Sequence, residues 1–215
     1  MKSAEIIREL RTHMPFTIFG AATGILIMVF SRKMSSEIML QVFYVLHPIH
    51  VVLSALVTAS IYEIHQCNSD GSGFVRGKCN FLVVLLIGYV GAIGVATLSD
   101  SVIPFLAEWI LGLPNREMHL GFIEKWWLVN PLAVAGVLFA YFKPNTRFPH
   151  AGHVLLSTWA SLFHIMMAMG AILAVSTYIA IFFFLFLAVW IPCCLSDIVF
   201  PLLFAGRKGS NSHIH

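Results

Sequence analysis

The sequence predicts an all-α integral membrane protein whose six transmembrane helices form a 3+3 inverted internal repeat. Three observations support this prediction: an apolar composition, six apolar stretches of membrane-spanning length, and polar motifs that occur twice. Of the 215 residues, 59% are hydrophobic and 11% are charged, whereas about a quarter of the residues in a soluble domain are charged. We therefore expect the chain to lie in a lipid bilayer.

Six apolar stretches are long enough to cross about 30 Å of hydrocarbon, which takes roughly 20 helical residues. They begin near Pro15, Met39, Phe81, Trp126, His150 and Thr177. The third and sixth stretches are longer than a straight crossing needs and contain Pro104 and Pro201. Proline removes a helix hydrogen bond and clashes with the preceding turn, so we expect these two helices to be kinked or broken there.

The distribution of lysine and arginine predicts the orientation, because these residues are enriched in short cytoplasmic loops. One predicted side carries Lys2, Arg8, Arg11, Arg76, Lys78, Lys143, Arg147, Arg207 and Lys208, and the other carries Arg32, Lys33, Arg116 and Lys125. Both termini should therefore be cytoplasmic, in a cell (inner) membrane. Because the basic residues flank helices instead of forming a patch with interleaved aromatics, nucleic acid is not expected as a partner.

Two cysteines, Cys67 and Cys79, bracket a polar loop on the predicted cytoplasmic side. Thiols stay reduced in that compartment, so a disulfide between them is allowed but not favoured.

Two motifs recur in the second half of the chain in the same order. HPIH (47–50) is matched by HAGH (150–153), and LSDSVIPFL (98–106) is matched by LSDIVFPLL (195–203). A weaker match joins PFTIFG (15–20) to PLAVAG (131–136). The chain therefore divides into two three-helix units, 15–112 and 126–206, joined by an interfacial connector, 113–125. An interfacial segment, 1–14, precedes them, and a tail predicted to be disordered, 207–215, follows.

An odd number of helices in each unit makes the second unit enter the membrane from the opposite side. Inverted repeats of this kind are frequent in secondary transporters, whose substrate sites lie near the midplane at the repeat interface. The repeated motifs should therefore meet at such an interface.

Polar residues follow each HxxH motif at helical spacing, and positions three and four apart share a helix face. The first stripe continues through Ser54 and Thr58, and the second through Ser157, Ser161 and His164. Unsatisfied polar groups are costly in hydrocarbon, so each stripe should line a helix contact or a water-filled cavity. Two interpretations stay open: the stripes bond the helices together, or their histidines serve a function.

Asp100 and Asp197 are the acidic residues that we place within the spanning segments. A carboxylate in the bilayer is costly unless it is paired, protonated or hydrated, which makes both residues functional candidates. The alternative is that each aspartate caps a helix before the proline-bearing segment. Thr97 precedes the first aspartate by three residues, and Cys194 precedes the second at the same spacing.

Imidazole and carboxylate together suit a divalent transition metal, Zn, Mn, Fe, Co or Ni, better than an organic solute. The predicted metal ligands are Asp100, Asp197, His47, His50, His150 and His153. The predicted supporting residues are Ser54, Thr58, Ser157, Ser161, His164, Thr97 and Cys194, with helix breaks at Pro104 and Pro201.

The functional expectation is a multi-pass transporter of such a metal ion, with the ion and the lipid bilayer as partners. Proton coupling is compatible with this, because both ligand types lose metal affinity on protonation; a homodimer is also compatible. A membrane-embedded metal-dependent hydrolase is an alternative, although the sequence holds no HExxH motif. A haem-binding electron carrier would leave both aspartates unexplained. A structural membrane protein with interlocking polar stripes is the remaining interpretation.

Overall fold

The computed structural model describes the chain outside residues 1–2, 68–78, 144–146, 170–173, 195–199 and 205–215. The described residues form helices and no strand, which confirms the all-α prediction. The elements are α1 (Ser3–Phe30), α2 (Ser36–Cys67), α3 (Phe81–Thr97), the π-helical turn η1 (Leu98–Val102), α4 (Ile103–Ile110), α5 (Gly121–Glu124), α6 (Trp126–Phe142), α7 (Arg147–Ala168), α8 (Val175–Cys194) and α9 (Phe200–Phe204).

Three stretches of the described helices are long and apolar enough to cross a membrane: Ser36–Gln66, Phe81–Ile110 and Val175–Cys193. Two shorter apolar helices cover Met14–Phe30 and Trp126–Phe142. The six-span inverted repeat therefore stays a prediction, and the membrane character has direct support.

The surface carries large apolar side chains, while several acidic side chains lie in the interior. Phe30, Leu82 and Val175 are 84%, 69% and 76% exposed, while Asp100 and Glu108 are fully buried. Large exposed apolar surfaces are unfavourable in water but are expected where lipid surrounds the chain. The apolar exterior is thus suited to a bilayer, although these two carboxylates lie in the interior.

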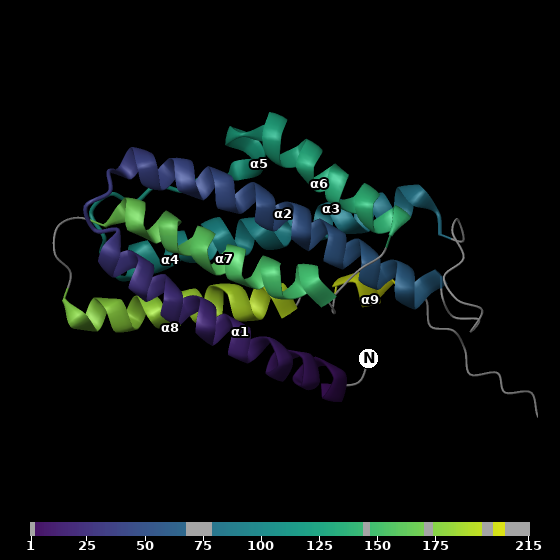
Figure 1. Cartoon of the computed structure of the whole chain (residues 1–215), viewed down its shortest axis with the longest axis horizontal. Coiled ribbons are helices and arrows are strands. Elements are labelled where there is room, and N and C mark those ends of the chain that lie inside the picture. Colours follow the sequence, from purple (N-terminus) through teal and green to yellow (C-terminus); the bar gives the residue numbers. More distant parts are fainter. Residues whose placement is uncertain (1–2, 68–78, 144–146, 170–173, 195–199, 205–215) are drawn as a thin grey trace, which may run out of the picture.

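Helices α2 and α7 form the central pair of the bundle and lie side by side in Figure 1. α2 also packs against α3 and α6, while α7 contacts α1, α8 and the η1–α4 segment. The polar stripes predicted from the sequence lie on these two helices, so the interface between α2, η1–α4 and α7 is where polar side chains can meet.

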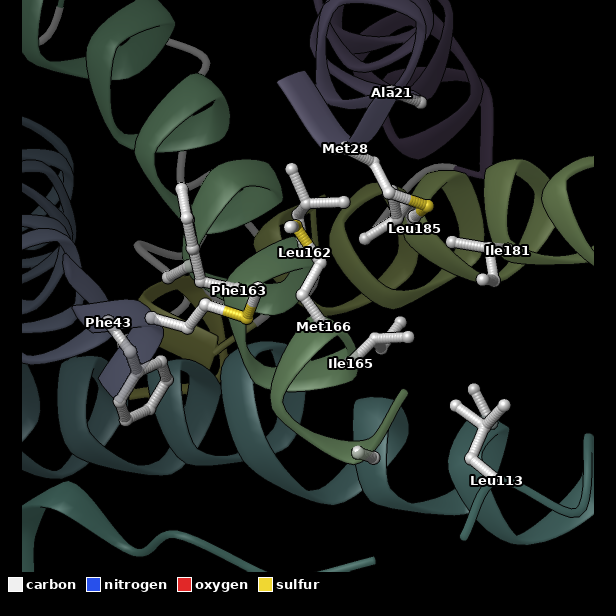
Figure 2. Packing of buried hydrophobic residues seen from close by; sticks show 14 residues of the cluster. Ala21, Met28, Phe43, Leu113, Leu162, Phe163, Ile165, Met166, Ile181 and Leu185 are labelled. Carbon is white, nitrogen blue, oxygen red and sulfur yellow. The ribbon is translucent and has the colours of Figure 1, made fainter. Parts of the chain in front are cut away.

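Apolar packing holds the outer helices against this pair. Figure 2 shows one cluster that joins α1, α7 and α8, in which Met28, Leu162 and Leu185 are fully buried. On the other side, α6 approaches α2 closely because Gly136 has no side chain. A Cβ atom at this position would lie 2.5 Å from the carbonyl oxygen of Val52.

The helix that contains Pro104 is continuous through a π turn, so the predicted break is absent, while the predicted kink stays a prediction. The amide of Ile103 donates to the carbonyl of Leu98, five residues earlier. Continuing this pattern would pair the carbonyl of Ser99 with residue 104, but proline has no N–H group. The hydroxyl of Ser161 on α7 lies 2.8 Å from that carbonyl and 2.8 Å from the carbonyl of Ser157 on its own helix, and its single proton serves both acceptors. A neighbouring helix therefore supplies a donor within reach of the group that proline leaves unpaired.

The corresponding region of the second half is only partly described. Pro201 is buried in the short helix α9. Residues 195–199, including Asp197, lie outside the described residues, so the second helix break stays a prediction.

Cys79 is disulfide-bonded, contrary to the expectation of reduced thiols at this end of the bundle. The side chain of its predicted partner, Cys67, lies outside the described residues. Disulfides are typical of oxidising compartments, which conflicts with the cytoplasmic assignment made from lysine and arginine. The cytoplasmic placement of both termini therefore stays a prediction, and the disulfide at Cys79 is evidence against it.

Candidate functional site

The carboxylate of Asp100 is the centre of a fully buried polar cluster. Its Oδ2 atom accepts hydrogen bonds from Nδ1 of His47 at 2.9 Å and from Nδ1 of His50 at 2.7 Å. Its Oδ1 atom accepts from the hydroxyls of Ser99 and Ser157, each at 2.7 Å. A carboxylate offers about four acceptor positions. Protein donors therefore occupy all the acceptor positions of this side chain.

Helix geometry explains why these groups converge. His47 and His50 are three residues apart on α2 and so share a face. Asp100 lies in the π turn that crosses this face, and Ser157 reaches it from α7. Three elements distant in sequence thus supply the donors to one side chain.

Neighbouring residues fix the orientation of both imidazole rings. The ring of Phe43 stacks on that of His47, with centroids 5.2 Å apart and planes 13° apart. On another side of the same ring lies Gly121 of α5, where an added Cβ atom would be 2.5 Å from both Cδ2 and Nε2. The rings of His50 and His153 stack with planes 8° apart and centroids 5.9 Å apart. The imidazoles are therefore held before any ligand arrives.

The cluster is short of positive charge. Among the described residues, the ion-pair partners of Asp100 are the two imidazoles, with no lysine or arginine. An ionised Asp100 with neutral histidines would leave one buried negative charge, which is costly in hydrocarbon. The cluster therefore favours added positive charge, either a proton held on one of its members or a bound metal ion.

The three side chains also have the spacing of a metal site. Ligand atoms of His47, His50 and Asp100 all lie within 4.8 Å of one another. A tetrahedral zinc ion, bound at about 2.0–2.2 Å, separates its ligand atoms by about 3.3–3.5 Å. The present hydrogen bonds of 2.7 and 2.9 Å would lengthen to admit such an ion. Each Nδ1 atom would then present a lone pair in place of its proton.

The remaining predicted residues are only partly brought together. Ser161 supports the site through the carbonyl of Ser99, while Ser54 and Thr58 are buried farther along α2. The side chain of Thr97 makes no capping hydrogen bond to η1. Asp197 and the side chains of His150 and Cys194 lie outside the described residues, so their predicted roles as ligands and support stay untested.

A second carboxylate–imidazole pair was not predicted from the sequence. Glu108 of α4 is fully buried, and its Oε1 atom accepts from Nδ1 of His164 at 2.7 Å. His164 was predicted only as a supporting residue of the first cluster. Its Nε2 atom accepts the backbone N–H of His119 at 3.3 Å. The polar stripe on α7 therefore contacts two carboxylates: Ser157 bonds to Asp100, and His164 bonds to Glu108.

The π turn explains why periodicity did not reveal Glu108. In a regular α-helix, a residue eight positions after Asp100 points about 80° away from it. A π turn contains one extra residue, so Asp100 and Glu108, eight residues apart, lie on the same face of η1–α4. They can therefore meet Ser157 and His164, which are seven residues apart on one face of α7. The sequence feature that could have revealed this pair is Glu108 itself, an acidic residue within an apolar stretch.

Glu124 lies at the surface and is linked to the Glu108–His164 pair through His119. It accepts hydrogen bonds from the hydroxyl of Tyr44, from the backbone N–H of Leu120 at 2.9 Å and from His119 at 3.2 Å. Burial by itself would raise the pKa of Glu124, but these donors outweigh it and hold the pKa below its usual value. The carboxylate is therefore kept ionised beside His119.

These features define an all-helical membrane protein with buried carboxylate–imidazole clusters. Comparison with protein-family models, curated proteins and solved structures finds no match to this chain. The functional inference therefore rests on the chemistry of the clusters themselves.

Proposed function

We propose that this protein transports a divalent transition-metal cation across a membrane, with His47, His50 and Asp100 as its central ligands. The observation that supports this proposal most strongly is the convergence of two imidazoles and one carboxylate, all buried, inside a bundle with an apolar exterior. Imidazole and carboxylate ligands suit Zn, Mn, Fe, Co and Ni. Ionisable groups within a membrane commonly mark the path of an ion or a proton.

The hydrogen bonds to Asp100 suggest how the ion would be exchanged. The Nδ1 atoms of His47 and His50 face Oδ2 of Asp100, where a cation would bind. To bind it through Nδ1, a neutral imidazole would move its proton to Nε2, whereas an imidazolium would release one proton, and renewed protonation would expel the cation. Competition between metal and protons for the same atoms gives transport a direct route to proton coupling.

The second half of the chain would supply the matching part of the transport path. In this proposal, units 15–112 and 126–206 form the inverted repeat, and Asp197, His150 and His153 face the central ligands across it. His153 already stacks on His50.

The two enzyme-like alternatives have less support. A hydrolytic metal site needs a general base beside the metal-bound water, whereas the described cluster holds Asp100 as its one carboxylate. A haem clamp needs two imidazole nitrogens that point at one iron. The rings of His50 and His153 are stacked nearly parallel, so their nitrogens do not point toward each other.

The test is metal binding and metal flux by the purified protein. Bound Zn²⁺, Mn²⁺ and Co²⁺ would be measured by elemental mass spectrometry, and uptake would be measured in proteoliposomes. We expect Asp100→Asn to weaken metal binding at least about tenfold and to reduce uptake to background. Ser101→Ala is the matched control, because its hydroxyl lies in the same π turn and has no described hydrogen-bond partner. Absence of metal binding by the wild-type protein would overturn the proposal.

A further inference from the structure

The pair formed by Glu108 and His164 has an unused ligand atom. Both side chains are 0% exposed, and they meet through Glu108 Oε1 and His164 Nδ1 at 2.7 Å. The second oxygen, Glu108 Oε2, is buried and has no hydrogen-bond partner among the described residues. A buried carboxylate oxygen without a donor is costly. Something other than a described side chain should therefore satisfy it.

Hydrogen bonding to His164 shows that the pair also lacks a compensating charge. Its Nε2 atom accepts the backbone N–H of His119 and so carries no proton. The ring proton must then be on Nδ1, and the imidazole is neutral. An ionised Glu108 therefore leaves one negative charge that the imidazole does not cancel.

His164 connects this pair to a surface pocket of about 230 Å³. The pocket is also lined by His119, Glu37 and Glu117, and its described lining contains no lysine or arginine. Carboxylates and imidazoles at the mouth of a pocket attract and bind cations. A cation entering from the surface would thus meet His164 before it reached the interior.

The pair lies close to the central ligands along the same helix. Asp100 and Glu108 lie on one continuous helix, eight residues or about 12 Å apart. Phe43 lies between the two clusters, with its ring centroid 5.2 Å from that of His47 and 5.6 Å from that of His164. One aromatic side chain therefore contacts an imidazole of each cluster.

We infer that Glu108 and His164 form a second binding site for the same divalent cation, an access site between the surface pocket and the central ligands. The inference rests on the proposed function and extends it by naming the route of the ion. Glu108 Oε2 would be one ligand, and Nδ1 of His164 would be the other once its proton moves to Nε2 and the contact with the His119 N–H is given up. With so few protein ligands, the access site would keep water in the coordination shell and bind the ion more weakly than the central site.

The test is a titration of the purified full-length protein with Co²⁺, followed by visible absorption and by equilibrium dialysis. We expect the wild-type protein to bind two ions of different affinity. Glu108→Gln should lose the weaker ion and keep the tighter one, and Asp100→Asn should do the reverse. Glu63→Gln is the matched control, because Glu63 is also a buried carboxylate with an unpaired oxygen, and it should keep both ions.

The outcomes separate the two proposals. A single ion that is lost in Asp100→Asn and kept in Glu108→Gln would overturn the access site and leave the proposed function standing. Absence of Co²⁺ binding in the wild-type protein would overturn both. Because Glu108→Gln leaves an amide in a buried position and could unfold the protein, His164→Gln provides a second test. Loss of the weaker ion in this variant supports the access site, and retention of both ions contradicts it.

Discussion

Asp100 and Glu108 are carried by the same continuous helix, but their carboxylates meet different surroundings. Asp100 accepts four hydrogen bonds from three elements. Glu108 accepts one described hydrogen bond and keeps one oxygen unpaired. The first carboxylate is held in place by donors that a cation would have to displace, whereas the second is equally buried but keeps one oxygen unpaired. Under the proposed function, the site at Asp100 should be the more rigid one and the site at Glu108 the weaker one.

The largest expected effect is the loss of stability in Asp100→Ala compared with Glu108→Ala. Removing Asp100 leaves two imidazoles and two hydroxyls without their acceptor, and loss of one partner of a buried pair costs about 3–5 kcal/mol. Glu108→Ala removes a single hydrogen bond and should cost about 1–3 kcal/mol. Denaturant unfolding in detergent measures both. Equal losses would mean that the two carboxylates do not differ as described.

The next effect concerns the packing of α5 against the central site. A Cβ atom in Gly121→Ala would overlap the ring of His47, so this imidazole must turn away from Asp100. Disturbing the orientation of a ligand typically costs 10–100-fold in metal affinity. Gly94→Ala is the control, since an added Cβ there has no atom within 4 Å. Metal titration of both variants should show the loss only at position 121.

A smaller effect is expected for a single donor to Asp100. Ser157→Ala removes one hydrogen bond to a carboxylate, which is worth about 1.5–3 kcal/mol. Ser54→Ala removes a buried hydroxyl without a described hydrogen-bond partner, so it should not cost the stability that a lost hydrogen bond costs. Thermal unfolding of the pair measures the difference. Matching melting temperatures would show that Ser157 is not a stabilising donor.

The smallest effect is a shift in pH dependence at the surface end of the second cluster. Tyr44→Phe removes one of the donors that hold the pKa of Glu124 down. A lowered carboxylate pKa contributes stability that is present at neutral pH and lost as the pH falls through that pKa. The variant should therefore lose this contribution at a higher pH than the wild-type protein. Melting temperatures recorded from neutral to acidic pH check the direction.

Local periodicity was sufficient to predict part of the central site. His47 and His50 share a helix face, and a carboxylate in an apolar stretch needs a partner, so their convergence with Asp100 follows from elementary rules. Helix positions follow from the apolar stretches in the same way. These predictions depend on contacts within one turn or on the cost of burying a charge.

Other features depend on long-range packing that the sequence does not reveal. The π turn changes the direction in which Glu108 points, and periodicity assumes a regular helix. The contact between Gly121 and His47 joins α5 to α2 through tertiary structure alone. His119 lies in a loop, and its contacts with His164 and Glu124 likewise arise from tertiary packing.

The measurement that tests the central claim most directly is X-ray absorption at the zinc edge, on protein loaded with one equivalent of Zn²⁺. The account predicts a shell of nitrogen and oxygen atoms at about 2.0–2.2 Å that includes imidazole scattering. The imidazole signal should disappear when His47 and His50 are both replaced by alanine, and it should persist in Ser101→Ala. A zinc shell without imidazole in the wild-type protein, or one unchanged by the double replacement, would contradict the assignment of His47, His50 and Asp100 as the central ligands.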